Sequence, residues 1–271
     1  MTPNLVATIP RQAKRAVRTW QTFFPGLVDL KFDVQRSLRN ALRYPFERDF
    51  RALPLLLGGL RRPPVVVDVG ANRGQSIDAV RLFRPDAEIH AFEPNPVLFE
   101  RLRRRHAADA GRIRLHNLAL AARAGGFELH VPSYNGFVFD GLASLSEAEA
   151  RSWLSPETLL GFRASRLKVD RFAVRAATLD SLGLAPDLVK IDVQGTEAEV
   201  VRGGLGTLRR ARPALLVELE GPSRGCRALL ESEGYVQLAF RGDRLTPGRG
   251  AMNSFFVHRS SPPGVAALGP T

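Results

Sequence analysis

The stretch VVVDVGANRGQS, residues 65–76, decides the fold. Four valines and an aspartate run directly into three small or turn-forming residues, Gly70, Asn72 and Gly74. A short apolar run followed by such residues predicts a buried strand, a tight turn and the start of a helix. Two interpretations fit this turn. Either a nucleotide-type ligand lies against its backbone, or it is only a close connection between strand and helix.

The chain around this stretch alternates between apolar runs and helical patterns. We expect a doubly wound α/β domain with a mostly parallel sheet over residues 63–259, because strands covered on both faces need not alternate in polarity. The expected strands are 65–69, 88–92, 112–120, 126–132, 171–178, 187–193 and 214–220, followed by a C-terminal antiparallel hairpin. The expected helices are 75–83, 96–109 and 196–210.

Two terminal segments flank this domain. Residues 1–62 predict a basic helical extension interrupted by prolines, with twelve Lys or Arg against four Asp or Glu. It is either a helical cap on the main domain or a surface that gathers substrate or contacts a membrane. Residues 260–271 predict a disordered tail. The long interruption 133–170 is a candidate cover for a substrate.

Composition narrows the class of protein. The 271 residues carry a formal net charge of +12, a single cysteine and no apolar run of membrane-spanning length. One cysteine gives neither an internal disulfide nor a metal cluster, and no secretory signal is recognisable. We therefore expect a cytoplasmic protein with no bound metal. Peripheral contact with the inner membrane surface is a further expectation, and the oligomeric state is open.

Gly70, Asn72 and Gly74 have the properties that a ligand site at a strand end requires. Glycine permits left-handed backbone and removes a Cβ that would collide with a ligand, and free N–H groups at a helix start attract negative oxygen. The spacing G-x-N-x-G differs from the G-x-G-x-x-G of dinucleotide enzymes. Nineteen residues after Gly74, Glu93 ends the next strand, where a carboxylate can accept hydrogen bonds from both ribose hydroxyls.

A second set of acids ends the later strands. Asp192 in VKIDVQGTE follows an expected central strand and would face the same edge of the sheet as the first turn. It is a candidate catalytic base, but it could equally cap a helix or pair with Lys190. Glu218, at the end of the next strand, is a second candidate base, with pairing to an arginine as the alternative.

Six stretches, taken in order, resemble one known family. VVVDVGANRGQS, IHAFEPNP, LHNLAL, TLDSL, DLVKIDVQGTE and PALLVELEG look like the FkbM family of S-adenosylmethionine-dependent methyltransferases, which are mostly O-methyltransferases. The likeness spans residues 63–258 and leaves out the N-terminal 62. It implies a Rossmann-like class I methyltransferase fold. Gln194 is a departure, since the family usually has glutamate there.

The resemblance assigns roles to individual residues. It implies that Asp68, Gly70, Asn72 and Gly74 surround the methionyl part of S-adenosylmethionine and that Glu93 binds the ribose. Asn117 and Leu118 would border the adenine, and Ser144 would line the cofactor pocket. The implied reaction is methyl transfer to a hydroxyl of a saccharide, glycolipid or other natural product, with Asp192 or Glu218 as base.

Two other functions compete with this one. The positive charge favours a nucleic-acid methyltransferase, but the sequence lacks an N/D-P-P-Y/F motif and a catalytic cysteine motif. A non-catalytic binding protein that retains the fold is the other alternative.

Overall fold

The computed structural model describes residues 11–218, 224–250 and 253–261. The chain divides into two compact units. The larger comprises Arg39–Phe127 and Ala173–Thr271, and the smaller comprises the residues up to Leu38 with Glu128–Phe172.

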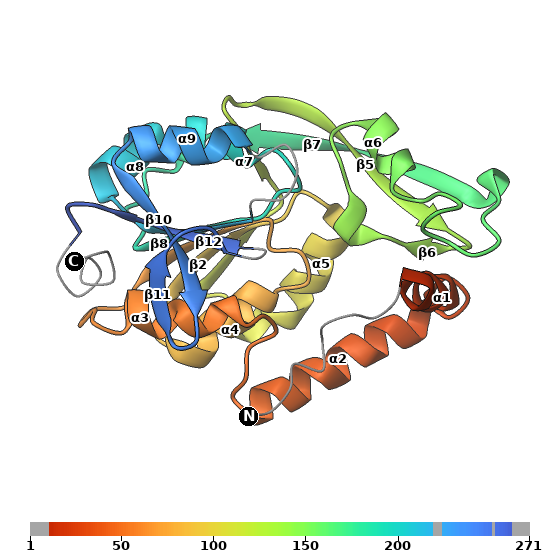
Figure 1. Ribbon diagram of the computed structural model, residues 1–271, viewed down its shortest axis with the longest axis horizontal. Coiled ribbons are helices and arrows are strands. Elements are labelled where there is room, and N and C mark those ends of the chain that lie inside the picture. Colours follow the sequence, from red (N-terminus) through yellow and green to blue (C-terminus); the bar gives the residue numbers. More distant parts are fainter. Residues whose placement is uncertain (1–10, 219–223, 251–252, 262–271) are drawn as a thin grey trace. The chain divides into compact units, whose positions relative to one another are not determined.

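An eight-stranded sheet forms the centre of the larger unit (Figure 1). Its strand order is β11-β10-β12-β9-β8-β1-β2-β3, and the pairs from β9 to β3 are parallel. A mostly parallel, doubly wound sheet is the predicted fold class, which the structure confirms. The strands are β1 (Val65–Val69), β2 (Glu88–Phe92), β3 (Ile113–His116), β8 (Leu188–Ile191), β9 (Ala214–Glu218), β10 (Tyr235–Arg241), β11 (Arg244–Pro247) and β12 (Asn253–His258).

Helices cover both faces of this sheet. Figure 1 shows α3 and α4 on one face and α7, α8 and α9 on the other. Alternate residues of each strand enter two separate cores: Val66 packs with Ile77 of α4, whereas Val67 packs with Val200 of α7. The helices are α3 (Leu53–Leu57), α4 (Gln75–Phe83), α5 (Pro96–Arg105), α7 (Glu197–Arg202), α8 (Leu205–Ala211) and α9 (Arg224–Ser232), with short 3₁₀ turns at Asp49–Ala52, Ala107–Asp109 and Asp180–Leu182.

Several expected boundaries are corrected by the structure. The helix expected over 196–210 is divided between α7 and α8, where a Cβ on Gly203 would lie 2.0 Å from the carbonyl oxygen of Ala121. The strand expected over 112–120 is divided into β3 and the separate β4 (Ala119–Leu120). The C-terminal hairpin forms from β10 and β11, but β12 inserts between β9 and β10. The strand expected over 214–220 is described to Glu218, and its last two residues lie outside the described residues.

A second sheet has the order β4-β7-β5-β6. Its strands are β5 (Gly125–Tyr134), β6 (Phe137–Val138) and β7 (Leu167–Ala177), besides β4. Residues 133–170 were expected to be a long interruption, and they form a packed region with α6 (Glu147–Ser152) and 3₁₀ turns at Asp140–Leu142 and Ala164–Arg166. They build an apolar core of their own from Tyr134, Phe137, Phe139, Leu154 and Leu159.

Two N-terminal helices, α1 (Arg11–Gln21) and α2 (Pro25–Ala41), precede the strands of the large sheet in the chain. Pro25 occupies the first position of α2, where a missing N–H costs no hydrogen bond. Within the smaller unit, Thr19 of α1 accepts a hydrogen bond from the N–H of Leu160 at 2.8 Å, and Arg15 donates to the carbonyl of Pro156 at 2.6 Å. No helix in the described ranges is both long and apolar enough to span a membrane.

Candidate functional site

The turn after β1 has the geometry that its sequence predicts. Gly70, Asn72 and Gly74 all have positive φ, at 78°, 49° and 86°. A Cβ on Gly70 would lie 1.9 Å from the carbonyl oxygen of Asp192, so the end of β1 approaches the end of β8 too closely for any side chain. At Gly74 the nearest atom to a Cβ would be a methyl group of Leu102, at 2.9 Å. The fold therefore requires glycine at position 70 whether or not a ligand binds, whereas at position 74 the neighbouring side chain can move.

Glu93 is buried just after β2 and faces this turn. One of its carboxylate oxygens accepts the N–H of Asn72 at 2.7 Å, and the other accepts the N–H of Asn95 at 2.8 Å. The side chain forms no ion pair with a described residue. Burial raises the pKa of Glu93 from 4.5 to about 7, although the two N–H groups and the more distant Lys190 oppose the shift. Each oxygen keeps a lone pair for a further donor.

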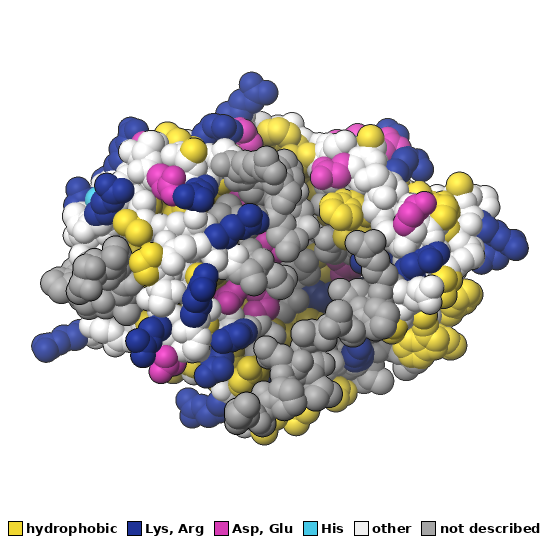
Figure 2. Space-filling view, in the orientation of Figure 1, with side chains coloured by type: hydrophobic (Ala, Val, Ile, Leu, Met, Phe, Trp, Pro, Cys, Tyr) yellow, Lys and Arg dark blue, Asp and Glu magenta, His cyan; other side chains and the backbone are white. Residues whose placement is uncertain are grey.

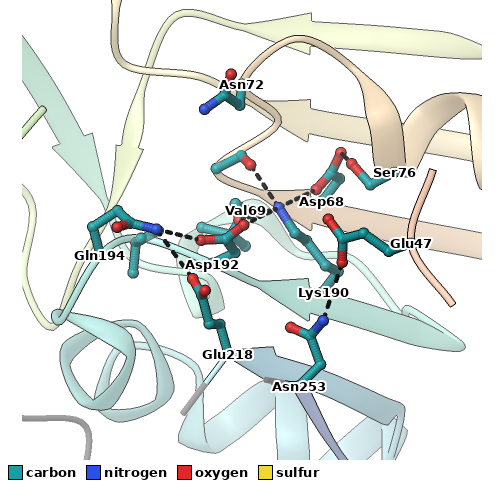
Figure 3. Close-up of polar contacts among 12 residues, drawn as sticks. Glu47, Asp68, Val69, Asn72, Ser76, Lys190, Asp192, Gln194, Glu218 and Asn253 are labelled. Carbon is teal, nitrogen blue, oxygen red and sulfur yellow. Dashed lines mark hydrogen bonds and ion pairs between the residues drawn. The ribbon is translucent and has the colours of Figure 1, made fainter. Parts of the chain in front are cut away.

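A buried lysine connects the turn to the end of β8. The amino group of Lys190 donates to the carbonyl of Gly70 at 2.6 Å, and it lies 3.3 Å from Asp68 and 3.5 Å from Asp192 (Figure 3). Asp68 also accepts a hydrogen bond from the hydroxyl of Ser76. Burial alone would lower the pKa of Lys190, but the charges of Asp68 and Asp192 raise it overall. The lysine therefore stays charged and is the cation that the two acids share.

Asp192 and Glu218 lie together at this edge of the sheet. The amide of Gln194 donates to both carboxylates, at 3.0 Å each. Burial opposes the charge of Asp192, but Lys190 and the hydrogen bonds around it hold its pKa below the ordinary value of 3.8. The alternative that Asp192 pairs with Lys190 is therefore observed. Gln194 itself has left-handed backbone, with φ 55°.

The remaining predicted residues have different surroundings. The amide of Asn117 donates to the carbonyls of Glu93 and Pro94, at 2.9 and 3.0 Å, and so holds the loop that follows β2. Leu118 is partly buried against the core beside β1 and β8. Ser144 belongs to the smaller unit, where its hydroxyl donates to Glu149 at 2.6 Å. The structure thus brings the other predicted residues together in the larger unit.

Two residues near Lys190, Glu47 and Asn253, are absent from the sequence-based prediction. Asn253, the first residue of β12, donates to Glu47 at 3.1 Å and to Asp49 at 3.2 Å. Figure 3 shows Glu47 beside the Lys190 side chain. No local motif marks either residue, because 206 positions separate them in the chain. For Lys190 itself a signal exists: a cation inside an apolar strand requires buried anions near it.

Cationic side chains do not define a nucleic-acid surface on the visible face. Figure 2 shows Lys and Arg spread over this face among apolar and uncharged side chains, without a continuous stripe. The single cysteine, Cys226, is fully buried in α9, and burial raises the pKa of its thiol to about 12. It belongs to the core and not to the edge of the sheet. Within the described ranges, no three His, Cys, Asp or Glu residues are grouped to hold a metal ion.

The fold and the strand-end residues define a Rossmann-like domain. Its glycine turn follows the first strand and its acid follows the second, at the sheet edge where such domains bind nucleotide-type ligands. The family model described as "Methyltransferase FkbM domain" matches residues 68–237, and the chain belongs to this family. The resemblance inferred from the six sequence stretches is thereby confirmed.

The chain is also similar to individual known proteins. The chain is 30% identical over 158 residues to 2-O-methyltransferase NoeI of Sinorhizobium fredii, an alignment covering 56% of this chain and 63% of that protein. It therefore matches less than two thirds of the length of this curated relative. A crystal structure of methyltransferase FkbM from Methylobacillus flagellatus has 18% identity and a TM-score of 0.48, over 78% of this chain and 48% of that one. An O-methyltransferase structure from Thermotoga maritima has 9% identity and a TM-score of 0.40, over 82% and 69%.

Proposed function

We propose that this protein is an S-adenosylmethionine-dependent O-methyltransferase acting on a hydroxyl of a saccharide, glycolipid or other natural product. Family membership supports methyl transfer, and the name of the relative from Sinorhizobium fredii supports oxygen as the acceptor atom. The observation that carries the proposal is the convergence of the β1 turn, Glu93 and Asp192 at one edge of the sheet.

The surroundings of Glu93 fit the ribose of this cofactor. A buried carboxylate with a raised pKa gains stabilisation from hydroxyl donors, and its free lone pairs can accept them. Asp68, Gly70, Asn72 and Gly74 would hold the methionyl part. Asn117 and Leu118 would border the adenine, and a place for Ser144 in the cofactor pocket stays a prediction.

The protein's task in this reaction is mainly alignment. When bound, the cofactor supplies a sulfonium-activated methyl group. Ideal placement of two reactants can lower a barrier by about 7–11 kcal/mol. We assign Asp192 and Glu218 to contact with the acceptor, since both carboxylates end neighbouring strands and share the amide of Gln194.

Isothermal titration with S-adenosylmethionine tests the proposal. The wild type should bind the cofactor, and Glu93→Gln should bind it at least about tenfold more weakly, because a charge-assisted hydrogen bond contributes about 1.5–3 kcal/mol. Glu88→Gln, which changes an acid at the opposite end of the same strand, is the matched control and should bind like the wild type. Absence of binding by the wild type would refute the proposed function. Equal affinity in wild type and Glu93→Gln would refute the ribose assignment.

We further assign α1 to peripheral contact with an anionic membrane, where a lipid-linked acceptor would be found. Its sequence has four Lys or Arg and no Asp or Glu. Val17, Trp20, Phe23 and Phe24, on the helix and the turn after it, are exposed by 47–58%. Cationic charge beside exposed aromatic rings suits the interface of an anionic bilayer. Trp20→Glu with Phe23→Glu should abolish sedimentation with anionic vesicles, and unchanged sedimentation would refute the contact.

A further inference from the structure

Glu47 lies beside Lys190 of β8 (Figure 3), although it is outside the part of the chain that matches the family. The matched region is 68–237, whereas Glu47 precedes it and its hydrogen-bond donor, Asn253, follows it. Asn253 pairs with Glu218 in the register of β12 and β9. Segments before and after the family domain therefore meet beside one of the two acids assigned to the acceptor.

The charged and polar groups facing Glu47 come from three elements. Lys190 on β8 attracts its carboxylate, while Asp192, just after β8, and Asp49 in the following 3₁₀ turn repel it. On β12, the neutral amide of Asn253 donates one hydrogen bond to it. Burial is the largest influence and raises the pKa of Glu47 above its ordinary value of 4.5, with the two repelling acids adding to the rise. Glu47 thus accepts a proton more readily than a carboxylate in water.

Asp192 has the opposite properties. Its carboxylate is engaged by the amino group of Lys190 at 3.5 Å and by the amide of Gln194 at 3.0 Å, and its pKa is lowered. A general base works best when its pKa lies near the working pH, so a carboxylate held anionic by a neighbouring cation is a weak proton acceptor. Glu47 is therefore better suited than Asp192 to removing a proton.

We propose that Glu47 is the general base of the reaction, taking the proton of the acceptor hydroxyl while Asn253 positions its carboxylate. The inference rests on the proposed function. As the acceptor oxygen forms its bond to the methyl carbon, the bond from that carbon to sulfur breaks and its electron pair stays on sulfur. The O–H proton passes to Glu47, which later releases it to solvent. Asp192 and Glu218 hold the acceptor.

The first test needs neither cofactor nor acceptor. In protein labelled with ¹³C at the glutamate carboxyls, Glu47 is assigned by the signal that Glu47→Gln removes, and it should titrate above 4.5. Asp49→Asn is the matched variant, because Asp49 accepts from the same Asn253 amide at 3.2 Å. It removes one repelling charge and should lower the pKa of Glu47. Titration of Glu47 at or below its ordinary pKa would overturn the proposal.

The second test separates catalysis from binding. Methyl transfer from radiolabelled S-adenosylmethionine is measured on a panel of methyl glycopyranosides and simple phenols. Glu47→Gln should lose about 10²- to 10⁴-fold in kcat while its affinity for the cofactor stays within twofold of the wild type. Asp49→Asn should shift the rise of kcat/KM to lower pH, in step with the lowered pKa of Glu47. In the wild type, kcat/KM should rise with pH through the pKa measured for Glu47.

Failure of the base assignment and failure of the function give different results. If the wild type binds no S-adenosylmethionine, the proposed function fails and the base assignment fails with it. If the wild type binds the cofactor and methylates a probe, but Glu47→Gln keeps its kcat, only the base assignment fails. Because glutamine is isosteric with glutamate and keeps an oxygen for the Asn253 amide, thermal melting should show Glu47→Gln to be folded.

Discussion

The ends of β2 and β8 each carry a carboxylate, and the protein treats the two in different ways. Glu93, after β2, is held by two backbone N–H groups, and burial raises its pKa to about 7. Asp192, after β8, lies beside a charged lysine, and its pKa is lowered. The first acid has capacity left for a ligand. The second already has a cationic partner within the fold.

The surroundings of Glu93 suit ligand binding, whereas those of Lys190 and Asp192 stabilise the fold. The Glu93 region consists of Glu93, the turn after β1 and the loop after β2. It depends on main-chain N–H donors, whose positions are determined by this turn and this loop. The Lys190 region, which consists of Lys190 with Asp68, Asp192, Gln194, Glu218, Glu47 and Asn253, depends on attraction between side chains of opposite charge in the interior. Substitutions in the Lys190 region should therefore reduce stability most, and changes to Glu93 should act mainly on ligand binding.

The largest effect is expected from Lys190→Met. It leaves Asp68, which is 2% exposed, and Asp192 without their cation, and breaking a buried ion pair costs about 3–5 kcal/mol. Urea denaturation should show that loss in the free energy of unfolding. Lys168→Met, at an exposed strand position, is the control and should change stability by less than about 0.5 kcal/mol. Similar results for the two variants would show that the lysine is not the charge centre of this region.

Gly70→Ala should rank second. Left-handed backbone costs a residue with a Cβ about 1–3 kcal/mol, and at Gly70 the new Cβ also meets the carbonyl oxygen of Asp192 at 1.9 Å. Gly74→Ala has a similar φ, but its nearest neighbour is a movable Leu102 methyl group. Thermal denaturation should therefore show a larger loss for Gly70→Ala than for Gly74→Ala. Equal losses would mean that the approach of β1 to β8 is not rigid.

The pH dependence of binding tests the Glu93 region directly. Ribose hydroxyls favour the carboxylate, so the affinity for S-adenosylmethionine should rise with pH by up to about tenfold per unit and level off above about 7. The Glu93→Gln protein should show no such rise. In the free protein the sign is reversed. Between about 4.5 and 7 the folded state binds a proton that the unfolded state releases, so this acid's contribution to stability falls as pH rises. A flat affinity profile in the wild type would contradict the assignment.

The sequence predicts the Glu93 region better than the Lys190 region. The strands 65–69 and 88–92 and the helix 75–83 occur at the expected residues, because turn residues border each apolar run. Glu93 follows β2 directly and faces the turn after β1, so a local pattern finds it. The Lys190 region gathers Glu47 and Asn253, whose encounter depends on β12 inserting beside β9. That insertion comes from tertiary packing and leaves no short-range signal.

The smallest effect is expected at Gln194, and it is the most specific for the charge balance of the Lys190 region. Gln194→Ala removes two hydrogen bonds from a side chain open to solvent, so the free energy of unfolding should fall by about 1 kcal/mol or less. Gln194→Glu instead places a third carboxylate between Asp192 and Glu218. Like charges disfavour ionisation, so this variant should be less stable than Gln194→Ala at neutral pH and should recover as the pH falls and the new acid binds a proton. Urea denaturation at neutral and acidic pH measures both variants. The free energy of unfolding of Gln194→Glu could instead lie below that of Gln194→Ala by the same amount at both pH values. That result would show that the shape of the Gln194 side chain matters and its lack of charge does not. The contrast with Glu93 would then depend on Lys190 alone.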